Sequence, residues 1–465
     1  MTNSSRAVTY HEIRDPIHAF VRMDSSEAKV VNSKPFQRLR HIHQLALTSL
    51  VYPAATHKRF EHCLGVMELA GRVYDVITNQ NNVLPEMRYL VPRNGEHEFT
   101  YWRRVVRMAA LCHDLGHLPF SHGAEQLLPT GYGHEELSRD LIQSDMMKPL
   151  WEELKVEPVD VAKLAVGAKH HPARLDEWES ILSEIIIGDT FGVDRMDYLL
   201  RDSHHVGVAY GRFDHFRLID TIRILPKGDI GDPTTNNKDQ LKLPPFQTEE
   251  DADRIRREEA SKEPTLGIES GGLQSAEGLL WARQFMWSQV YLHHTRQVYD
   301  LHLADFLKSW LANGQFSTDL EIHLSLTDNE VMTGIMEACR DPHTPGHESA
   351  KAIVERRHFR RIYEGNPTDK KVALNALSLI FEALSEKYGP NNVKMKSRNP
   401  KSEGRHFPVL TSSGQCESST SLSETFQKMP VVSANNVYIH PDLRDEAKSW
   451  LDREKVRILR AVISE

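Results

Sequence analysis

The chain has 465 residues, which suits one large helical domain with appendages or about two to three domains. Apolar residues make up 40% of the chain and charged residues 26%, which is typical of a globular protein and excludes a wholly disordered or collagen-like one. The formal net charge of −8 disfavours a dominant basic surface for nucleic acid.

The beginning of the chain and its cysteines indicate a compartment. The first 15 residues contain no apolar segment typical of a secretory signal, and no stretch reaches the roughly 18 to 20 apolar residues that span a bilayer. The four cysteines are scattered without a CxxC pair, which is typical of a reducing environment and disfavours a zinc ribbon. We therefore expect a cytoplasmic protein without a membrane partner.

Helical periodicity dominates the first half of the chain. Apolar residues recur every three or four positions in 35–45, 59–77 and 102–117, and each of these segments predicts a helix with one buried face. Pro119 ends or kinks the third helix. Further helices are expected at 134–148, 158–170, 178–188 and 192–204.

The second half of the chain is more mixed. Residues 226–272 contain few apolar residues and a run of charges, so we expect a small β or irregular insertion there. Helices return in 273–388 and complete the active site, and 389–465 predicts a small α+β appendage. With a catalytic core at 1–225, the sequence predicts a mainly α protein.

Histidine is frequent, with 25 residues, and several gather in the segment LCHDLGHLPFSH. His113 and Asp114 are consecutive there, and both can reach a metal ion between them. Imidazole and carboxylate together suit Fe, Mn, Co or Zn. Because two ligands are too few, His62 in RFEH and Asp194 in FGVDRMD are the natural additions. Water on such a metal has a lowered pKa and can attack phosphorus.

Five segments occur in an order that resembles a known family. PFQRLRHIHQL, HKRFEHCLGV, CHDLGHLPFSH, GHEE and VDRMDYLLRDSHHVG together resemble the HD-domain deoxynucleoside triphosphate triphosphohydrolases. HD-GYP phosphodiesterases are less similar, since LGHLPF follows the HD pair instead of DxGK. The resemblance implies an HD-domain helical core, a metal site of His62, His113, Asp114 and Asp194, and hydrolysis of a dNTP to deoxynucleoside and inorganic triphosphate.

The resemblance also assigns residues to the phosphates and to proton transfer. A triphosphate leaving group needs cations around it. The family's phosphate-contacting positions correspond to Arg59, His117, Arg195 and Arg283. His122 matches the family's general acid, and Glu125 and His134 match the residues that support it. As an alternative, His134 only begins a helix and Arg59 forms a surface ion pair.

A sugar pocket is implied on the helix that carries Asp194. Tyr198 and Asp202 follow Asp194 at i+4 and i+8, on the same face of that helix. In the family, this tyrosine packs against the sugar and this aspartate holds the 3′-hydroxyl. Gln44 and Leu45 match a loop that also contacts the sugar, although the family's Gly-rich turn after it is missing here.

The base side and an activator site depart from the family pattern. Tyr291 is expected to close the side of the substrate pocket that faces the nucleobase. Trp287 lies where animal members of the family have His, and its indole can stack on a base or narrow the pocket. Both aromatics also fit plain core positions. Asn32 replaces an acidic residue that reads a guanine in activated relatives, while Gln37 and Arg40 of that site are retained, so we do not expect guanine-nucleotide activation of the usual form.

The leading hypothesis is a metal-dependent dNTP triphosphohydrolase, with Fe, Mn or Zn at the HD site and Mg or Mn on the triphosphate. An HD-type nucleotide phosphomonoesterase or phosphodiesterase shares the metal site and is the second hypothesis. A non-catalytic nucleic-acid-binding scaffold is the third, and the acidic charge balance disfavours it. Because the family forms dimers and tetramers, we expect a homo-oligomer; no SAM domain is expected before the catalytic core.

Overall fold

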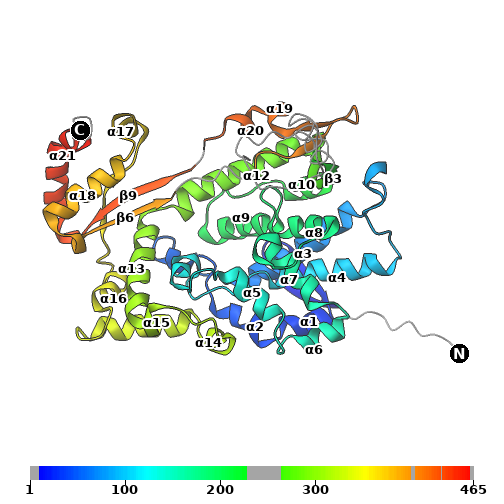
Figure 1. Ribbon diagram of the computed structural model, residues 1–465, viewed down its shortest axis with the longest axis horizontal. Coiled ribbons are helices and arrows are strands. Elements are labelled where there is room, and N and C mark those ends of the chain that lie inside the picture. The colour runs from blue at the N-terminus through cyan, green and yellow to red at the C-terminus, as the bar shows by residue number, and fades with distance from the viewer. Residues whose placement is uncertain (1–9, 228–262, 399–403, 431, 461–465) are drawn as a thin grey trace, which may run out of the picture.

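The structure is a computed structural model that describes residues 10–227, 263–398, 404–430 and 432–460. Its elements are mostly helices, and the strands within these ranges form one hairpin and two small sheets. The prediction of a mainly α fold is therefore confirmed. In Figure 1, helices α1 to α16 form the body of the molecule, and α17, α18 and α21 lie beside β6 and β9 at the end where the chain terminates.

The described chain opens with a hairpin. β1 (Tyr10–Asp15) pairs antiparallel with β2 (Ala19–Asp24), and the carboxylate of Asp24 caps the first helix in a capping box with Glu27. The elements that follow are α1 (Ser25–Val31), α2 (Lys34–Arg38) and the 3₁₀ segments η1 (Leu39–His41) and η2 (Ala46–Leu50).

The largest core lies among five helices that carry the apolar stripes expected from the sequence. α3 (Arg59–Ile77) packs against α4 (His97–Cys112), α8 (Glu177–Ile187) and α9 (Val193–Val206), and α7 (Pro158–His170) packs against α4 and α8. Their apolar faces are almost fully buried. Shorter elements surround them: η3 (Pro85–Met87), η4 (Ser121–Gly123), η5 (Glu125–Leu127), α5 (His134–Ile142), α6 (Lys148–Leu154) and α10 (His215–Thr221).

Three expected helices end earlier than the periodicity predicts. The helix expected at 35–45 is wrong beyond His41, since Ile42 is extended and His43 forms a β-bridge with Lys58, so that tertiary contacts override local periodicity. The helix at 102–117 ends at Cys112 and continues as tight turns. The helix at 134–148 ends at Ile142, and α6 begins separately with a proline in its first turn.

One strand leads into the expected insertion at 226–272, and another lies near its end. β3 (Ile222–Pro226) pairs antiparallel with β4 (Pro264–Glu269), and the centre of the insertion, 228–262, lies outside the described residues. β4 also pairs in parallel with β7 (Pro408–Leu410), which pairs with β8 (Cys416–Ser418). Strands far apart in the sequence therefore share one sheet.

A second core forms around the helices after the insertion. η6 (Ser270–Gly272) and α12 (Leu273–Met286) lead into a single π-helical turn, η7 (Trp287–Tyr291), and then into α13 (His294–Trp310). α13 packs on α16 (His347–Val354), which packs on α15 (Asp328–Arg340). The short elements between them are η8 (Ala312–Gly314) and α14 (Leu320–Ser325).

The C-terminal sheet has its own small core. Its strand order is β5 (Arg360–Glu364), β9 (Ala434–Ile439) and β6 (Val393–Arg398), all antiparallel, with α18 (Ala376–Tyr388) and α21 (Arg444–Arg460) packed on it. The remaining elements are α17 (Pro367–Val372), η9 (Pro390–Asn392), α19 (Ser419–Leu422), α20 (Glu424–Lys428) and η10 (Pro441–Leu443). None of the helices in the described ranges combines the length and apolar character needed to cross a bilayer.

Candidate metal centre

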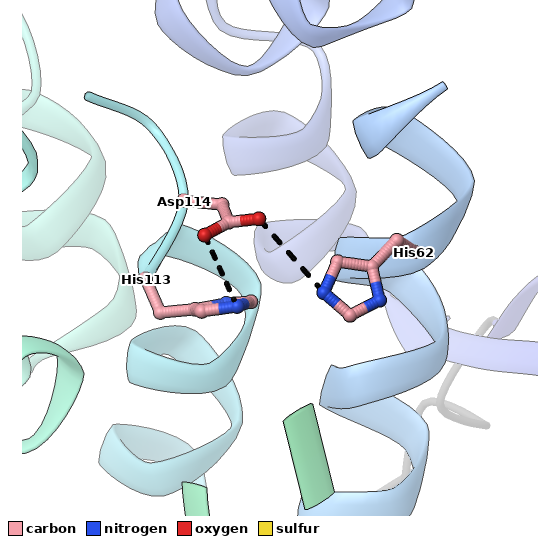
Figure 2. A group of neighbouring side chains, drawn as sticks. All are labelled: His62, His113 and Asp114. Carbon is pink, nitrogen blue, oxygen red and sulfur yellow. Dashed lines mark ion pairs between the residues drawn. The ribbon is translucent and has the colours of Figure 1, made fainter. Parts of the chain in front are cut away.

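Four side chains from three separate parts of the fold meet beside α3. His62 lies in the first turn of α3, His113 and Asp114 in the turn that follows α4, and Asp194 in the first turn of α9. Figure 2 shows His62, His113 and Asp114 pointing toward one another; Nε2 of His62 and of His113 lie 3.8 and 3.4 Å from the Asp114 carboxylate. Asp194 Oδ1 lies 3.0 Å from His62 Nε2 and 3.5 Å from His113 Nε2. We call these four residues the ligand cluster.

The imidazoles of the ligand cluster direct their Nε2 atoms toward its centre. His113 Nδ1 donates to the backbone carbonyl of Ala110 at 2.8 Å, and His62 Nδ1 donates to Asp197 Oδ2 at 2.8 Å. The Nε2 atom of each ring therefore faces inward, and that of His113 is buried without a hydrogen-bond partner among the described residues. Two inward nitrogens beside two carboxylates form a donor set that fits a divalent transition metal.

Both carboxylates of the ligand cluster stay ionised. Burial favours the neutral form of Asp114, but the Arg59 guanidinium, which donates to Asp114 Oδ2, holds the pKa of this carboxyl well below its usual range. Burial likewise opposes ionisation of Asp194, but the neighbouring imidazoles of His113 and His62 lower its pKa. Metal ligands must be deprotonated, so this environment favours a bound cation.

A second buried group, the supporting cluster, holds the first in place; it consists of His18, Asp197, Arg201 and Asp15. Asp197 accepts from His62 Nδ1, from His18 Nε2 at 2.6 Å and from Arg201 at 2.8 and 2.9 Å. Arg201 also donates to Asp15 at 2.8 Å. Sequence reasoning missed this cluster, although the i, i+4 spacing of Asp197 and Arg201 on α9 was a usable signal.

A glycine lets the two helices that carry these clusters approach each other. Gly65 lies on α3 beneath the supporting cluster, and a Cβ atom there would stand 1.9 Å from Asp197 Oδ1 and 2.5 Å from Arg201 Nη2. A residue larger than glycine would therefore displace the ion pair. This contact explains the glycine in the segment RFEHCLG.

The expected phosphate-binding residues divide into two places. Arg59 donates to Ser121 Oγ at 2.9 and 3.2 Å as well as to Asp114, and His117 Nε2 lies 3.2 Å from Asp114 Oδ1. These two residues adjoin the ligand cluster. Arg195 and Arg283 instead share a small pocket that none of the four ligand residues lines.

The expected proton-transfer group is partly described. The side chain of His122 lies outside the described part of the chain. His134 Nδ1 donates to Glu125 Oε1 at 2.5 Å, and the ring of His134 stacks on that of His117 with centroids 4.0 Å apart. Burial lowers the pKa of His117, while Glu125 and Glu135 outweigh burial and raise the pKa of His134. The two stacked imidazoles are therefore shifted in opposite directions, with the pKa of His117 lowered and that of His134 raised.

The expected sugar residues gather around a buried carboxylate. Asp202 is 1% exposed and accepts from the Tyr291 hydroxyl and from His57 Nε2, each at 2.7 Å. Tyr198 lies edge-on to Tyr291, with ring centroids 6.0 Å apart. The charge of Asp202 adds to burial in raising the pKa of Tyr291 well above its ordinary value. Sequence reasoning missed a role for His57, although it is the first residue of the segment HKRFEHCLGV.

Gln44 and Leu45 follow the bridge residue His43, and both are buried. The side-chain oxygen of Gln44 has no hydrogen-bond partner among the described residues. An unsatisfied buried acceptor is rare in folded proteins, so it marks a place where a ligand donor fits.

Trp287 begins the π-helical turn that also contains Tyr291, and the two rings are 5.4 Å apart. The Arg398 guanidinium lies 4.3 Å from the centre of the indole ring. π-Helical turns are frequent at functional sites, and a half-buried indole under a cation is an unusual core residue.

The residues of the expected activator site have local partners. Asn32 ends α1, and the Gln37 amide donates to the Val31 carbonyl at 2.7 Å. Arg40 donates to Gln37 at 2.9 Å and lies over the ring of Phe60. Gln37 and Arg40 thus also serve the local packing of α2 and α3.

Comparisons with known proteins agree with the motifs. A family model described as HD domain matches residues 59–199, and one described as HD associated region matches 251–376. The chain is 33% identical over 288 residues to an uncharacterized protein of Methanocaldococcus jannaschii, covering 62% of this chain and 47% of that protein. It is 32% identical over 240 residues to the deoxynucleoside triphosphate triphosphohydrolase SAMHD1 of Homo sapiens, covering 46% and 36%.

The chain thus spans about half the length or less of these two relatives. A solved structure matches over a longer range: the crystal structure of a hypothetical protein from Aquifex aeolicus has a TM-score of 0.74 and 28% identity, covering 95% of this chain and 100% of that one. The likeness therefore extends beyond the HD domain to the helices and sheets that surround it.

Proposed function

We propose that this chain is an HD-domain, metal-dependent phosphohydrolase that converts a dNTP to deoxynucleoside and inorganic triphosphate. The observation that carries the proposal is the ligand cluster, in which two inward imidazole nitrogens, the buried carboxylate of Asp114 and the partly exposed carboxylate of Asp194 converge. The similarity to a deoxynucleoside triphosphate triphosphohydrolase over 240 residues supports the choice of substrate.

The ligand cluster would hold Fe, Mn or Zn, and a second ion, Mg or Mn, would accompany the triphosphate. Such a metal supplies activation of water for attack on phosphorus and stabilises the charge that develops there. Asp194 belongs to the open side of the cluster, since its side chain is 33% exposed while those of His62, His113 and Asp114 are 7% exposed or less. The substrate would reach the cluster from this side.

Arg59 and His117 would bind the phosphate oxygens. Arg59 already lies between Asp114 and Ser121, which fixes its guanidinium beside the cluster. His117 is kept neutral by burial and by the nearby cations, so that it donates a hydrogen bond without adding charge. The pair of His134 and Glu125 would orient His122, which protonates the departing 5′ oxygen.

The sugar would lie against Tyr198 and Tyr291, with its 3′-hydroxyl on Asp202. Asp202 is anchored by two donors and keeps lone pairs for a third. A tyrosine ring close to C2′ leaves no room for a ribose hydroxyl, which favours deoxynucleotides. The indole of Trp287 would stack on the base, since its ring lies beside Tyr291.

Product analysis tests the proposal. The purified protein is incubated with each of the four dNTPs and with ATP in Mn²⁺, and with a dNTP mixture, and the products are separated by ion exchange. We expect deoxynucleoside and triphosphate, and little reaction with ATP. Cleavage of monophosphates or cyclic nucleotides without triphosphate would instead support the phosphomonoesterase or phosphodiesterase hypothesis.

We also propose that the protein is a homo-oligomer. α12 presents Trp281 and Phe285, which are 41% and 42% exposed and stacked on each other, and Tyr210 lies beside Phe285. Exposed aromatics that adjoin one another are typical of protein interfaces. Sedimentation of the wild-type protein and of the Trp281→Ser variant measures this directly: the variant should shift toward monomer.

A further inference from the structure

The turn beside the ligand cluster has an uncommon backbone. Phe120 and Ser121 are consecutive, neither is glycine, and their φ angles are 56° and 59°, in the left-handed region. Side chains with a Cβ atom disfavour this region, so two such residues in a row persist only where the surroundings hold them. Ser121 is also the residue that receives the Arg59 guanidinium. The strained turn therefore contacts a residue that binds the cluster.

One buried carboxylate from a distant helix holds this turn. Asp328 is the first residue of α15 and is 2% exposed. Its Oδ1 accepts the backbone N–H of Phe120 at 2.7 Å. Its Oδ2 accepts both the backbone N–H and the ring Nδ1–H of His43, at 2.7 and 2.6 Å. Asp328 thus joins the strained turn to the segment that also carries Gln44 and Leu45.

His43 extends the network to the start of α3. The ammonium of Lys58 donates to His43 Nε2 at 2.6 Å, so the proton on the ring belongs to Nδ1, which donates to Asp328. The ring of His43 is nearly parallel to that of Phe120, at 6°. Lys58 directly precedes Arg59, so the network ends beside the same arginine that contacts Ser121.

A second brace runs from the same part of the chain. The buried guanidinium of Arg38 donates to the His117 carbonyl and to the Leu326 carbonyl, each at 2.9 Å. His117 directly precedes the turn of Leu118 to Ser121 that contains Phe120, and Leu326 lies two residues before Asp328. Two independent contacts therefore bind the segment before α15 to the turn beside the ligand cluster.

We infer that Asp328 is a positioning residue for the site. By accepting from Phe120 and His43, it keeps Phe120 and Ser121 in the left-handed conformation that brings Ser121 to Arg59. Without it, the turn relaxes toward ordinary φ values and Arg59 loses its fixed orientation. The effect of Asp328 on turnover rests on the proposed function, whereas its effect on the turn does not.

Variants of Asp328 and a matched aspartate test the inference. Asp328→Ala removes all three hydrogen bonds that the carboxylate accepts from Phe120 and His43. Asp328→Asn keeps one side-chain oxygen, so it can accept only some of these hydrogen bonds. Asp319→Asn is the control, because Asp319 caps the neighbouring helix α14 through the Ile322 N–H and its side chain makes no hydrogen bond or ion pair with the turn among the described residues. Each protein is assayed for kcat and KM on the best dNTP, for bound metal per chain, and for hydrogen exchange of residues 117–123.

Misplacement of a group by about 1 Å can lower turnover by about 100-fold, so we expect kcat to fall between about 10- and 100-fold in Asp328→Ala and less in Asp328→Asn. Metal content should stay at the wild-type value, and exchange at 117–123 should rise in both variants but not in Asp319→Asn. Turnover within twofold of wild type would overturn the inference, and so would unchanged exchange or a loss of metal equal to the loss of activity.

A milder variant, His43→Gln, tests the same network in case Asp328→Ala fails to fold. His43→Gln leaves the backbone bond from residue 43 to Asp328 in place and removes only the ring bond and the link to Lys58, and His43 is 25% exposed, so the change is mild. It should raise exchange at 117–123 by less than Asp328→Ala does. If the wild-type protein does not hydrolyse dNTPs, the proposed function fails, and the exchange measurement alone decides the role of Asp328.

Discussion

Two groups of buried histidines and carboxylates lie next to each other along α9, and they differ in how completely their charges are satisfied. In the supporting cluster, Asp197 accepts from two imidazoles and a guanidinium, and Arg201 donates to two carboxylates. In the ligand cluster, Asp194 Oδ1 lies 3.0 Å from Nε2 of His62, whose Nδ1 contacts Asp197. In the first group the charges of Asp197 and Arg201 are paired with each other and with Asp15, and only the far nitrogen of His18 has no partner among the described residues. In the second, the buried Nε2 of His113 has no such partner and lies next to both carboxylates.

This difference distinguishes the supporting cluster, which is structural, from the ligand cluster, which is the candidate metal site. Residue type alone does not make this distinction. Asp194 and Asp197 are three positions apart on one helix, and both contact the same ring, His62. Buried charges that are fully paired hold a structure in one arrangement, whereas an incomplete set of donors is the mark of a ligand site. Four predictions test whether the two clusters are distinct in this way.

The largest effect is expected from Asp194→Ala. Removing one ligand should abolish metal binding and lower turnover by about 1,000-fold or more, because a catalytic metal is worth several kcal/mol of transition-state stabilisation. Thermal stability in EDTA should fall less than in Asp197→Ala, since the Asp194 side chain is 33% exposed and, among the described residues, contacts only the two imidazoles of the cluster. Metal analysis, dNTP turnover and thermal melts measure these quantities, with Asp445→Ala, an exposed aspartate, as the control. Full activity without metal would contradict the mechanism.

Asp197→Ala should behave in the opposite way. It leaves His18 buried without a carboxylate and Arg201 with Asp15 alone, and breaking a buried ion pair in this way typically costs about 3–5 kcal/mol of stability. The stability loss should appear in EDTA as well, because it does not depend on metal. Metal affinity should fall by only about 10- to 100-fold, since His62 loses its orienting partner and remains a ligand. Equal loss of metal in the two variants would erase the distinction between the clusters.

The third prediction concerns how the stability contributed by Asp197 depends on pH. The expected change in stability is no larger than the loss caused by Asp197→Ala itself. Burial raises the pKa of Asp197, but Arg201 and the imidazoles outweigh it and hold the pKa well below the ordinary value of about 3.9. A lowered carboxyl pKa stabilises the fold above the unfolded pKa, and this stabilisation is lost as the pH falls toward the folded pKa. The difference between wild type and Asp197→Ala in EDTA should therefore be full at pH 7 and shrink below about pH 4. A difference that persists undiminished to pH 3 would contradict this assignment.

The smallest effect is expected from Gly65→Ala. The added methyl group would collide with Asp197 and Arg201, and overpacking of this kind typically costs about 1–3 kcal/mol. Gly278→Ala on α12 is the matched control, because its nearest neighbour would be the Phe213 Cβ at 3.5 Å, an ordinary contact. The control should be stabilised by a few tenths to about 1 kcal/mol through helix propensity. Chemical unfolding measures both, and equal behaviour would show that α3 and α9 can separate without cost.

The sequence predicted the helical class well and the ends of helices less well. Apolar periodicity is a local signal, so it identified 59–77, 158–170 and 192–204 within about two residues of α3, α7 and α9. It failed after His41, where the chain leaves the helix to place His43 against Lys58 and Asp328. No pattern within 35–45 records those partners, which lie 15 and 285 residues away.

For the candidate site, the sequence alone determined the ordered motifs, the family and the residues able to ligate a metal, because residue type and short spacing suffice for these. Only the tertiary structure decided the role of each aspartate of α9. Asp194, Asp197 and Asp202 share one helix, and they differ in the partners that distant segments bring to them: His113, Arg201 with His18, and His57 with Tyr291. Electrostatic environment depends on such through-space neighbours, so a linear sequence does not record it.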